Sequence, residues 1–239
     1  MKKIILSILS VFIVFALVNT SRAQNAEYYF NSAISKVKSG DYEGALMDYD
    51  KAIAVNPKLP NVYFNRGLTK FSLSDFSGAI SDFDEAINLD SKMENAYFNR
   101  GLAKYNLGDL TGSISDFNKA LEINPDMDNV YFNKALVEYN LGNLDDAIKD
   151  FGKTTKLNPK LAVAYFNKAI SEYKVGSFED CIVDCDSAIK LSPENGEIYN
   201  TRGLAKFKNN DNLGACRDWQ RAGELGSENA LESISRLCK

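Results

Sequence analysis

Apolar and polar positions recur along this chain at a fixed spacing of 34 residues. The clearest marker is the triplet Tyr-Phe-Asn, in which two aromatic residues precede an amide. Its five copies begin at Tyr29, Tyr63, Tyr97, Tyr131 and Tyr165, and a shortened sixth copy begins at Tyr199. A strict period of this length indicates an array of stacked repeats. Function in such an array is expected along a surface of equivalent residues and not in one pocket.

Each period has the pattern of two helices joined by a tight turn. The first helix starts near the tyrosine and stops at a residue that in most copies tolerates the left-handed conformation. These stops are Gly40, Ser74, Gly108, Gly142, Gly176 and Asn210. A short polar residue follows each stop and can cap the second helix. These predicted caps are Asp41, Asp75, Asp109, Asn143, Ser177 and Asp211. Four of the six second helices then meet a proline, which cannot continue a helix.

Small and large residues alternate where the two helices of a period must approach each other. The first helices carry the small residues Ala33, Gly67, Gly101, Ala135, Ala169 and Gly203. The second helices carry the large residues Tyr49, Phe83, Phe117, Phe151 and Trp219. This alternation predicts closely packed helix pairs. Because one pair cannot bury its apolar face alone, neighbouring pairs are expected to complete the core.

These columns resemble the tetratricopeptide repeat. The resemblance divides the chain into six repeats and a C-terminal capping helix over residues 228–239, with Leu231, Ile234 and Leu237 on one face. The repeats are residues 26–59, 60–93, 94–127, 128–161, 162–195 and 196–227. Departures from the family pattern are local, because only single positions such as Ser74, Ser91, Cys185 and Ser227 differ. The resemblance implies an all-α fold, a right-handed superhelix (α-solenoid) whose concave face is lined by the first helices and binds peptide segments.

Residues 1–23 have the features of a cleaved signal peptide. Two lysines precede an apolar run from Ile4 to Val18, and Ser21 and Ala23 are small residues at the two positions that a signal peptidase recognises. Cleavage after Ala23 would place the mature protein in the periplasm or outside the cell. The alternative is an uncleaved membrane anchor, although the run is shorter than the about 20 residues that a spanning helix needs.

Charge and composition argue against several classes of function. The chain has 28 basic and 32 acidic residues, so its net charge is −4; without residues 1–23, 25 basic residues remain and the net charge is −7. This charge, with no basic cluster, argues against a nucleic-acid partner. Membrane contact by the mature chain is equally unsupported. The chain has no histidine, the commonest general base and metal ligand. Because no nucleophile, paired-carboxylate or phosphate-loop pattern is found either, we expect no enzyme activity, no cofactor and no metal.

The phenylalanine and asparagine of the triplet are predicted to face the concave groove that the resemblance implies. An asparagine side chain both donates and accepts, so it can pair with an extended backbone of any sequence. Phenylalanine supplies apolar contact between those points. The predicted peptide-binding residues are Phe64, Asn65, Phe98, Asn99, Phe132, Asn133, Phe166 and Asn167. The alternative is that both columns only cap helices and pack between adjacent repeats.

Two further columns carry charge. The second helices hold Asp48, Asp82, Asp116, Asp150, Asp184 and Asp218. The first helices hold Arg66, Arg100, Lys134, Lys168 and Arg202, and the first repeat has Ser32 instead. We expect each aspartate to pair with the base of the following repeat, so that the first repeat needs no base. Asp218 would then meet Arg236 in the capping helix.

The four cysteines fall into two pairs. Cys181 and Cys185 lie four residues apart on one helix. Their Cβ atoms would be about 6 Å apart, too far for a relaxed disulfide, so we expect two buried thiols. The run Gly-Ala-Cys-Arg-Asp-Trp from Gly214, with Cys238 near the C-terminus, resembles the ending of other exported bacterial proteins of this repeat family. That resemblance implies a Cys216–Cys238 disulfide that pins the capping helix; four free thiols are the alternative.

The sequence therefore predicts a non-catalytic protein-interaction module of the bacterial envelope. It would hold an extended segment of a protein partner in its concave groove. The alternative function is a structural adaptor in an envelope assembly, which would use the convex face or the ends of the array.

Overall fold

The computed structural model describes residues 24–238, and every regular element among them is an α-helix. A first helix covers 24–39 of the described residues. The others are α2 (Tyr42–Val55), α3 (Pro60–Ser72), α4 (Phe76–Leu89), α5 (Glu94–Asn106), α6 (Leu110–Ile123), α7 (Asp128–Leu141), α8 (Leu144–Leu157), α9 (Ala162–Val175), α10 (Phe178–Leu191), α11 (Gly196–Lys208), α12 (Asn212–Glu224) and α13 (Glu228–Leu237). The all-α repeat fold that the period predicts is confirmed. The predicted signal peptide lies outside the described residues.

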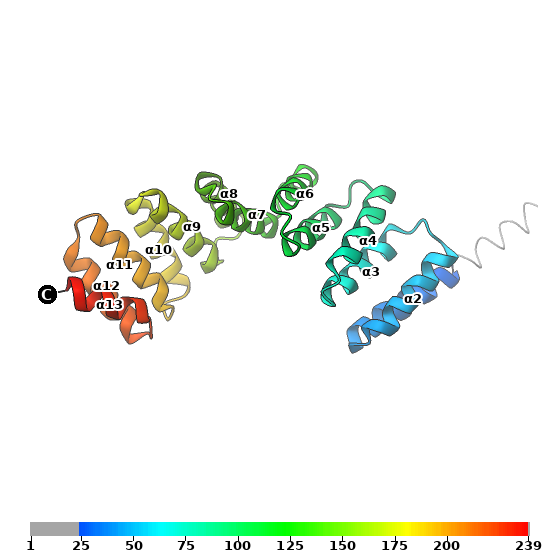
Figure 1. Ribbon diagram of the computed structural model, residues 1–239, viewed down its shortest axis with the longest axis horizontal. Coiled ribbons are helices and arrows are strands. Elements are labelled where there is room, and N and C mark those ends of the chain that lie inside the picture. Colours follow the sequence, from blue (N-terminus) through cyan, green and yellow to red (C-terminus); the bar gives the residue numbers. More distant parts are fainter. Residues whose placement is uncertain (1–23, 239) are drawn as a thin grey trace, which may run out of the picture. The chain divides into compact units, whose positions relative to one another are not determined.

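The helices form two compact units, one ending at Ile123 and the other beginning at Asn124. In the N-terminal unit, α3 packs against α4, α4 against α5 and α5 against α6. In the C-terminal unit the same succession runs from α7 to α13. Figure 1 shows this order of helices along the chain. Each helix thus packs mainly on its neighbours in sequence, as a stacked array requires.

All six predicted stops of the first helices are confirmed by their backbone conformation. Each has a positive φ, between 62° and 89°, in the left-handed region. Ser74 and Asn210 adopt this conformation without being glycine, at 62° and 64°. The turn is stabilised because the next amide reaches back to the helix; Asp75 N–H, for example, donates to the Lys70 carbonyl at 2.9 Å.

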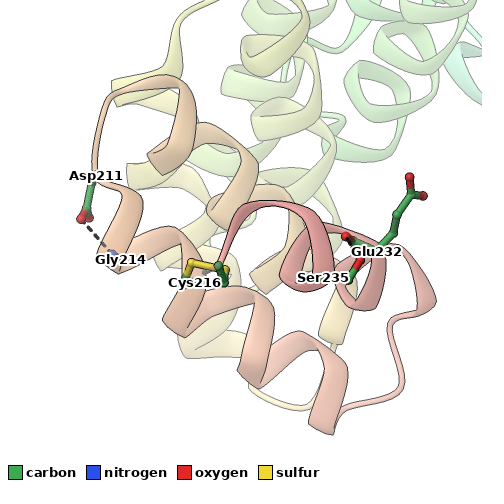
Figure 2. The surroundings of a disulfide bond; sticks show 6 residues. Asp211, Gly214, Cys216, Glu232 and Ser235 are labelled. Atoms are coloured by element: carbon green, nitrogen blue, oxygen red, sulfur yellow. Dashed lines mark hydrogen bonds between the residues drawn. A yellow bond between two sulfur atoms is a disulfide. The ribbon is translucent and has the colours of Figure 1, made fainter.

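Four of the six predicted N-caps are confirmed. The carboxylates of Asp41, Asp75, Asp109 and Asp211 accept a hydrogen bond from the backbone N–H of the glycine three residues later, as Figure 2 shows for Asp211 and Gly214. A Cβ on any of these glycines would collide with the capping carboxylate. The prediction is wrong for Asn143 and Ser177, whose side chains make no capping bond. Asp146 and Asp180 stand at the position that glycine occupies in the four capped copies.

Close contact between the two helices of a pair is confirmed at the small residues. A Cβ on Gly67 would lie 2.7 Å from the ring of Phe83, and a Cβ on Gly203 would lie 2.7 Å from the ring of Trp219. The rings of Phe83 and Trp219 are fully buried. In the repeats that carry a glycine here, it sets how near the first helix comes to its partner.

The C-terminal helix α13 is joined to α12 by a disulfide between Cys216 and Cys238 (Figure 2). Ile234 packs with Trp219 and Ala222 in one apolar cluster, which confirms that α13 covers the last repeat. The predicted apolar face is only partly buried, because Leu231 and Leu237 remain 57% and 42% exposed. The helix is short and lies on the narrow surface of one helix pair, so it covers that pair incompletely.

The other two cysteines are free thiols with no exposed surface. Contact with Cys181 and burial raise the pKa of the Cys185 thiol far above its ordinary value, so it stays protonated. They pack with Ile198 and Ala188 in the core of the fifth and sixth helix pairs. Their role in this structure is that of small apolar side chains.

Candidate functional site

The phenylalanines of the triplet lie half-buried on the first helices, where they pack against the buried aromatic residues of the second helices. Ring centroids lie 5.9 Å apart for Phe64 and Phe83, and 5.8 Å apart for Phe98 and Phe117. Phe132 lies 5.7 Å from Phe151 in the same way. One face of each phenylalanine therefore belongs to the core, and only the remaining surface can contact a ligand.

Phe166 has different neighbours. The residue opposite it is Cys185, where other repeats have an aromatic ring, and Phe166 packs against the cluster of Cys181, Cys185 and Ala188. Like the other phenylalanines of the triplet, it remains partly exposed.

The asparagines of the triplet are held by their own helices. The Nδ2 atom of Asn65 donates to the Asn61 carbonyl at 2.8 Å, and that of Asn99 donates to the Asn95 carbonyl at 2.8 Å. Asn133 and Asn167 donate in the same way, at 2.7 Å and 2.8 Å. This bond uses one of the four hydrogen-bonding positions of each side chain. Among the described residues no hydrogen bond to their Oδ1 atoms is seen, so each oxygen can still accept one from a ligand.

The structure places the eight predicted residues in two groups, one in each compact unit. We call Phe64, Asn65, Phe98 and Asn99 the N-terminal ladder. They lie on α3 and α5, which contact each other directly. We call Phe132, Asn133, Phe166 and Asn167 the C-terminal ladder; they lie on α7 and α9. Within each ladder the side chains are partly exposed. Core contacts hold the phenylalanines, and hydrogen bonds to their own helices hold the asparagines.

Beside the N-terminal ladder lies a hollow of about 310 Å³ that the period did not predict. Its lining residues are Glu27, Phe30, Asn56, Leu59, Asn61 and Val62. They come from the first helix, the loop between α2 and α3, and the start of α3. One feature of the sequence sets this place apart, because Glu27 occupies the column that holds asparagine in the next three repeats.

The charged columns pair within a repeat, so the expected pairing with the following repeat is wrong. Arg100 donates to Asp116 through Nη2 at 2.6 Å and Nε at 2.9 Å. Lys134 lies 2.6 Å from Asp150, and Lys168 lies 2.6 Å from Asp184. The two helices of one repeat are antiparallel neighbours, and this brings residues sixteen positions apart face to face.

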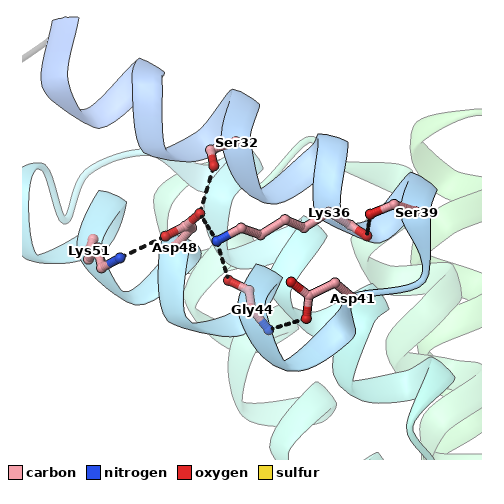
Figure 3. A network of polar contacts seen from close by, with 7 residues as sticks. All are labelled: Ser32, Lys36, Ser39, Asp41, Gly44, Asp48 and Lys51. Carbon is pink, nitrogen blue, oxygen red and sulfur yellow. Dashed lines mark hydrogen bonds and ion pairs between the residues drawn. The ribbon is translucent and has the colours of Figure 1, made fainter.

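Both ends of the charged column also differ from the prediction. Asp218 pairs with Arg202 at 2.6 Å, and Arg236 pairs with Glu232 of its own helix at 2.9 Å. In the first repeat, Asp48 accepts from Ser32 and from the ammonium groups of Lys36 and Lys51, as Figure 3 shows. The two ammonium groups hold the pKa of Asp48 far below its usual range.

Links between repeats come from a second acidic column, two residues after the first. Asp84 lies 2.5 Å from Arg100 of the next repeat. Asp50 and Asp186 make the same contact with Arg66 and Arg202. A guanidinium has several donors in a fixed plane, so one arginine can bind two carboxylates at once. Each arginine of this column therefore ties its own second helix to that of the preceding repeat.

The fourth and fifth repeats replace this arrangement. Lys134 and Lys168 stand where other repeats have arginine, and Asn118 and Gly152 stand where their linking acid would be. One turn after each lysine comes Glu138 or Glu172, which lie 3.3 Å and 3.1 Å from the lysine ammonium groups. Other repeats have a lysine there, such as Lys104.

Each of these two clusters holds two buried carboxyl groups and one ammonium group. Burial and the nearby Asp150 raise the pKa of Glu138 to about 7, and burial and Asp184 raise the pKa of Glu172 to about 8. The Oε2 atoms of both glutamates are buried without a hydrogen-bond partner. Each glutamate is therefore expected to bind a proton near neutral pH.

Family models match a long part of the chain. Models of the tetratricopeptide repeat match residues 60–93, 94–127 and 128–161, and a model described as a TPR repeat matches residues 35–74. Together they cover residues 35–161, just over half of the 239 residues. The chain belongs to the tetratricopeptide repeat family. No curated protein matches this tetratricopeptide repeat chain.

Several solved structures have the same fold. The protein YrrB, described as a TPR protein with an unusual peptide-binding site, is 18% identical with a TM-score of 0.73, and the match covers 78% of this chain and 97% of YrrB. PilF of Pseudomonas aeruginosa is 17% identical with a TM-score of 0.70, covering 90% and 99%. A tetratricopeptide repeat protein of Parabacteroides merdae is 22% identical with a TM-score of 0.59, covering 89% and 82%. At these identities the likeness shows the fold alone.

Two further findings concern the described part of the tetratricopeptide repeat chain. None of the helices described there has the length and apolar character needed to span a bilayer. Over the same residues, no three Cys, Asp or Glu side chains are grouped as metal ligands would be.

A double-mutant cycle distinguishes pairing within a repeat from pairing with the next one. Replacing Asp116 and Arg100 with Ala, singly and together, should give a coupling free energy of about 1–3 kcal/mol, because the two side chains are in contact. The matched cycle of Asp116 with Lys134 should stay within about 0.5 kcal/mol. Urea unfolding followed by circular dichroism measures both. Stronger coupling to Lys134 would contradict the pairing described above.

The two glutamate clusters predict that stability falls as pH rises. A free glutamate has a pKa of about 4.3, so between about pH 4.5 and pH 8 the folded protein binds more protons than the unfolded chain. The contribution of the two glutamates to the free energy of unfolding is then fully present below that window. It is lost as pH rises through the window, by about 1.4 kcal/mol per unit of pKa shift. Thermal unfolding at pH 5, 7 and 9 measures the decline.

The double variant Glu138→Gln, Glu172→Gln keeps the shape of the protonated glutamates and should remove most of this decline. Glu85→Gln, at an exposed position on α4, is the matched control and should retain it. An equal loss of melting temperature between pH 5 and pH 9 in all three proteins would rule out the buried glutamates as its cause.

Proposed function

We propose that this protein is a non-catalytic interaction module that holds an extended segment of another protein along its phenylalanine and asparagine ladders. Membership of the tetratricopeptide repeat family and the fold support a protein-interaction module. The proposal that the ladders bind an extended segment rests on the hydrogen bonding of the asparagine side chains. Each is fixed by one bond to its own helix, while its Oδ1 atom is left for a ligand.

The geometry of the ladders suits a backbone rather than a particular side chain. A fixed carboxamide can accept from a peptide N–H and donate its second N–H to a peptide carbonyl. The neighbouring phenylalanine is held against a buried ring, for example Phe98 against Phe117, so little entropy is lost when it contacts a ligand. The repeats proposed to contribute these residues are the second to the fifth, residues 60–93, 94–127, 128–161 and 162–195.

The proposed location is the bacterial envelope, in the periplasm or outside the cell, after cleavage behind Ala23. The Cys216–Cys238 disulfide is compatible with an oxidising compartment. The acidic composition and the absence of a basic cluster support protein partners over nucleic acid.

A second candidate is an adaptor that binds through the end of the array. Tyr28 is 69% exposed, whereas its equivalents Val62 and Ala96 in the next two repeats are buried. A large exposed aromatic side chain in an otherwise buried column is a feature that an end-on partner could cover.

Site-specific photo-crosslinking in the cell envelope of the source organism tests both proposals. A photoreactive residue at Asn99 should capture a discrete protein partner, and one at Asn118, exposed on the second helix of the same repeat, should not. With the captured partner purified, Asn65→Ala and Asn99→Ala together should weaken binding at least tenfold, whereas Asn88→Ala and Asn118→Ala should not.

The outcomes separate the two candidates. Capture from Asn99 with loss of affinity in the ladder variant supports the ladders as the binding surface. A third photoreactive residue, placed at Tyr28, tests the adaptor. Capture from Tyr28 alone, with unchanged affinity in the Asn65→Ala, Asn99→Ala variant, would reject the ladder and support the adaptor.

A further inference from the structure

The hollow beside the N-terminal ladder has an apolar floor and a polar rim. Phe30, Leu59 and Val62 supply the apolar surface, and Glu27, Asn56 and Asn61 supply the polar groups. Its volume of about 310 Å³ is at the lower end of the range of ligand pockets, about 300–1,000 Å³. A hollow of this size takes one large side chain and part of its backbone.

The polar groups of the rim have unused hydrogen-bonding capacity. In the fourth repeat, Asn158 donates through Nδ2 to Asp128 at 2.9 Å. Asn56 is the equivalent residue in the first repeat, where Ala26 replaces the aspartate. Asn56 accepts from Lys58 N–H through Oδ1, and the structure shows no acceptor for its Nδ2 among the described residues.

Glu27 supplies a negative charge without a described ion pair. It is exposed on the first helix, and no lysine or arginine of residues 24–238 lines the hollow. Glutamate at this place departs from Asn61, Asn95 and Asn129, which fill the same column in the next three repeats. The hollow therefore joins an apolar floor to a carboxylate that has no ion pair among the described residues, which favours a ligand with an apolar group next to a positive charge.

The hollow is continuous with the N-terminal ladder through Asn61. The backbone carbonyl of Asn61 accepts the bond that fixes Asn65, and Asn61 is one of the residues that line the hollow. A segment that pairs with Asn65 is therefore close enough to place its next side chains in the hollow.

We infer that the hollow is the anchoring subsite of the groove, and that it takes a large apolar side chain of the partner next to a basic residue. The apolar side chain contacts Phe30, Leu59 and Val62, and the basic residue lies against Glu27. The carboxamides of Asn56 and Asn61 bind the peptide backbone between them. This inference rests on the proposed function, because it assigns sequence preference to one end of a surface that is otherwise indifferent to sequence.

Selection of peptides from a random dodecamer phage library on the purified full protein tests the subsite. Enriched peptides should contain an apolar residue beside Lys or Arg. For a synthetic peptide of that sequence, Glu27→Lys should weaken binding about tenfold. Replacing the basic residue of the peptide by Glu should weaken binding to the wild type and restore it to the Glu27→Lys variant. Asn61→Phe, which fills the hollow, should also weaken binding about tenfold.

Matched controls use the same columns in other repeats. Glu197→Lys and Asn129→Phe are equivalent to Glu27→Lys and Asn61→Phe, and both lie at exposed positions of the C-terminal unit. Each should change affinity less than twofold. Peptides enriched without the apolar–basic pair, or a Glu27→Lys variant with unchanged affinity, would overturn the subsite.

Failure of the subsite is distinguishable from failure of the groove. If Asn65→Ala and Asn99→Ala weaken peptide binding while Glu27→Lys and Asn61→Phe do not, the subsite is rejected and the groove stands. If none of these variants changes binding, the groove proposal is rejected and the subsite with it. If no peptide is enriched, the subsite is rejected, because the rest of the groove is proposed to be indifferent to sequence.

Discussion

In three helix pairs of this protein, the approach of an aromatic ring to a glycine backbone determines how close the two helices lie. The rings of Phe83, Phe117 and Trp219 lie so close to Gly67, Gly101 and Gly203 that a methyl group on the glycine would overlap them. Well-packed interiors tolerate few such changes in volume. Because the rings of Phe83 and Phe117 also pack against the phenylalanine of the triplet, the contact that fixes these helix pairs also fixes the proposed binding side chain. The asparagine that follows is left on the open side of the helix.

The buried charges serve a different purpose from the apolar contacts. A buried ion pair is weak evidence of added stability, because removing two ions from water has a large free-energy cost. The arginines align neighbouring repeats, since Arg100 binds Asp116 of its own repeat and Asp84 of the preceding one. The lysine repeats lack that second partner and instead bury Glu138 or Glu172. Their charge is balanced only when the glutamate binds a proton, so the two halves of the chain respond differently to pH.

The sequence was informative wherever one position decides one local conformation. The left-handed stops and the close approach at Gly67 were predictable in this way, and the Cys216–Cys238 disulfide was implied by the family resemblance. Contacts between columns were less so, because a 34-residue period shows that residues are equivalent and not which columns face each other. Asp116 was therefore assigned to Lys134, although the antiparallel packing of one helix pair places it against Arg100. Asn143 and Ser177 are residue types that commonly cap helices, so the sequence did not show that they make no capping bond. The hollow at Leu59 and Val62 depended on how two helices and a loop meet.

The central claim is that the asparagine carboxamides of the ladders bind the backbone of an extended partner segment. It is tested most directly by nuclear magnetic resonance of the side-chain amide groups during titration with the segment captured by crosslinking. The account predicts that the Nδ2–H signals of Asn65 and Asn99 shift and exchange more slowly with water, while those of Asn88 and Asn118 on the second helices stay unchanged. Shifts confined to Asn88 and Asn118, with unchanged ladder signals in a saturated complex, would contradict it.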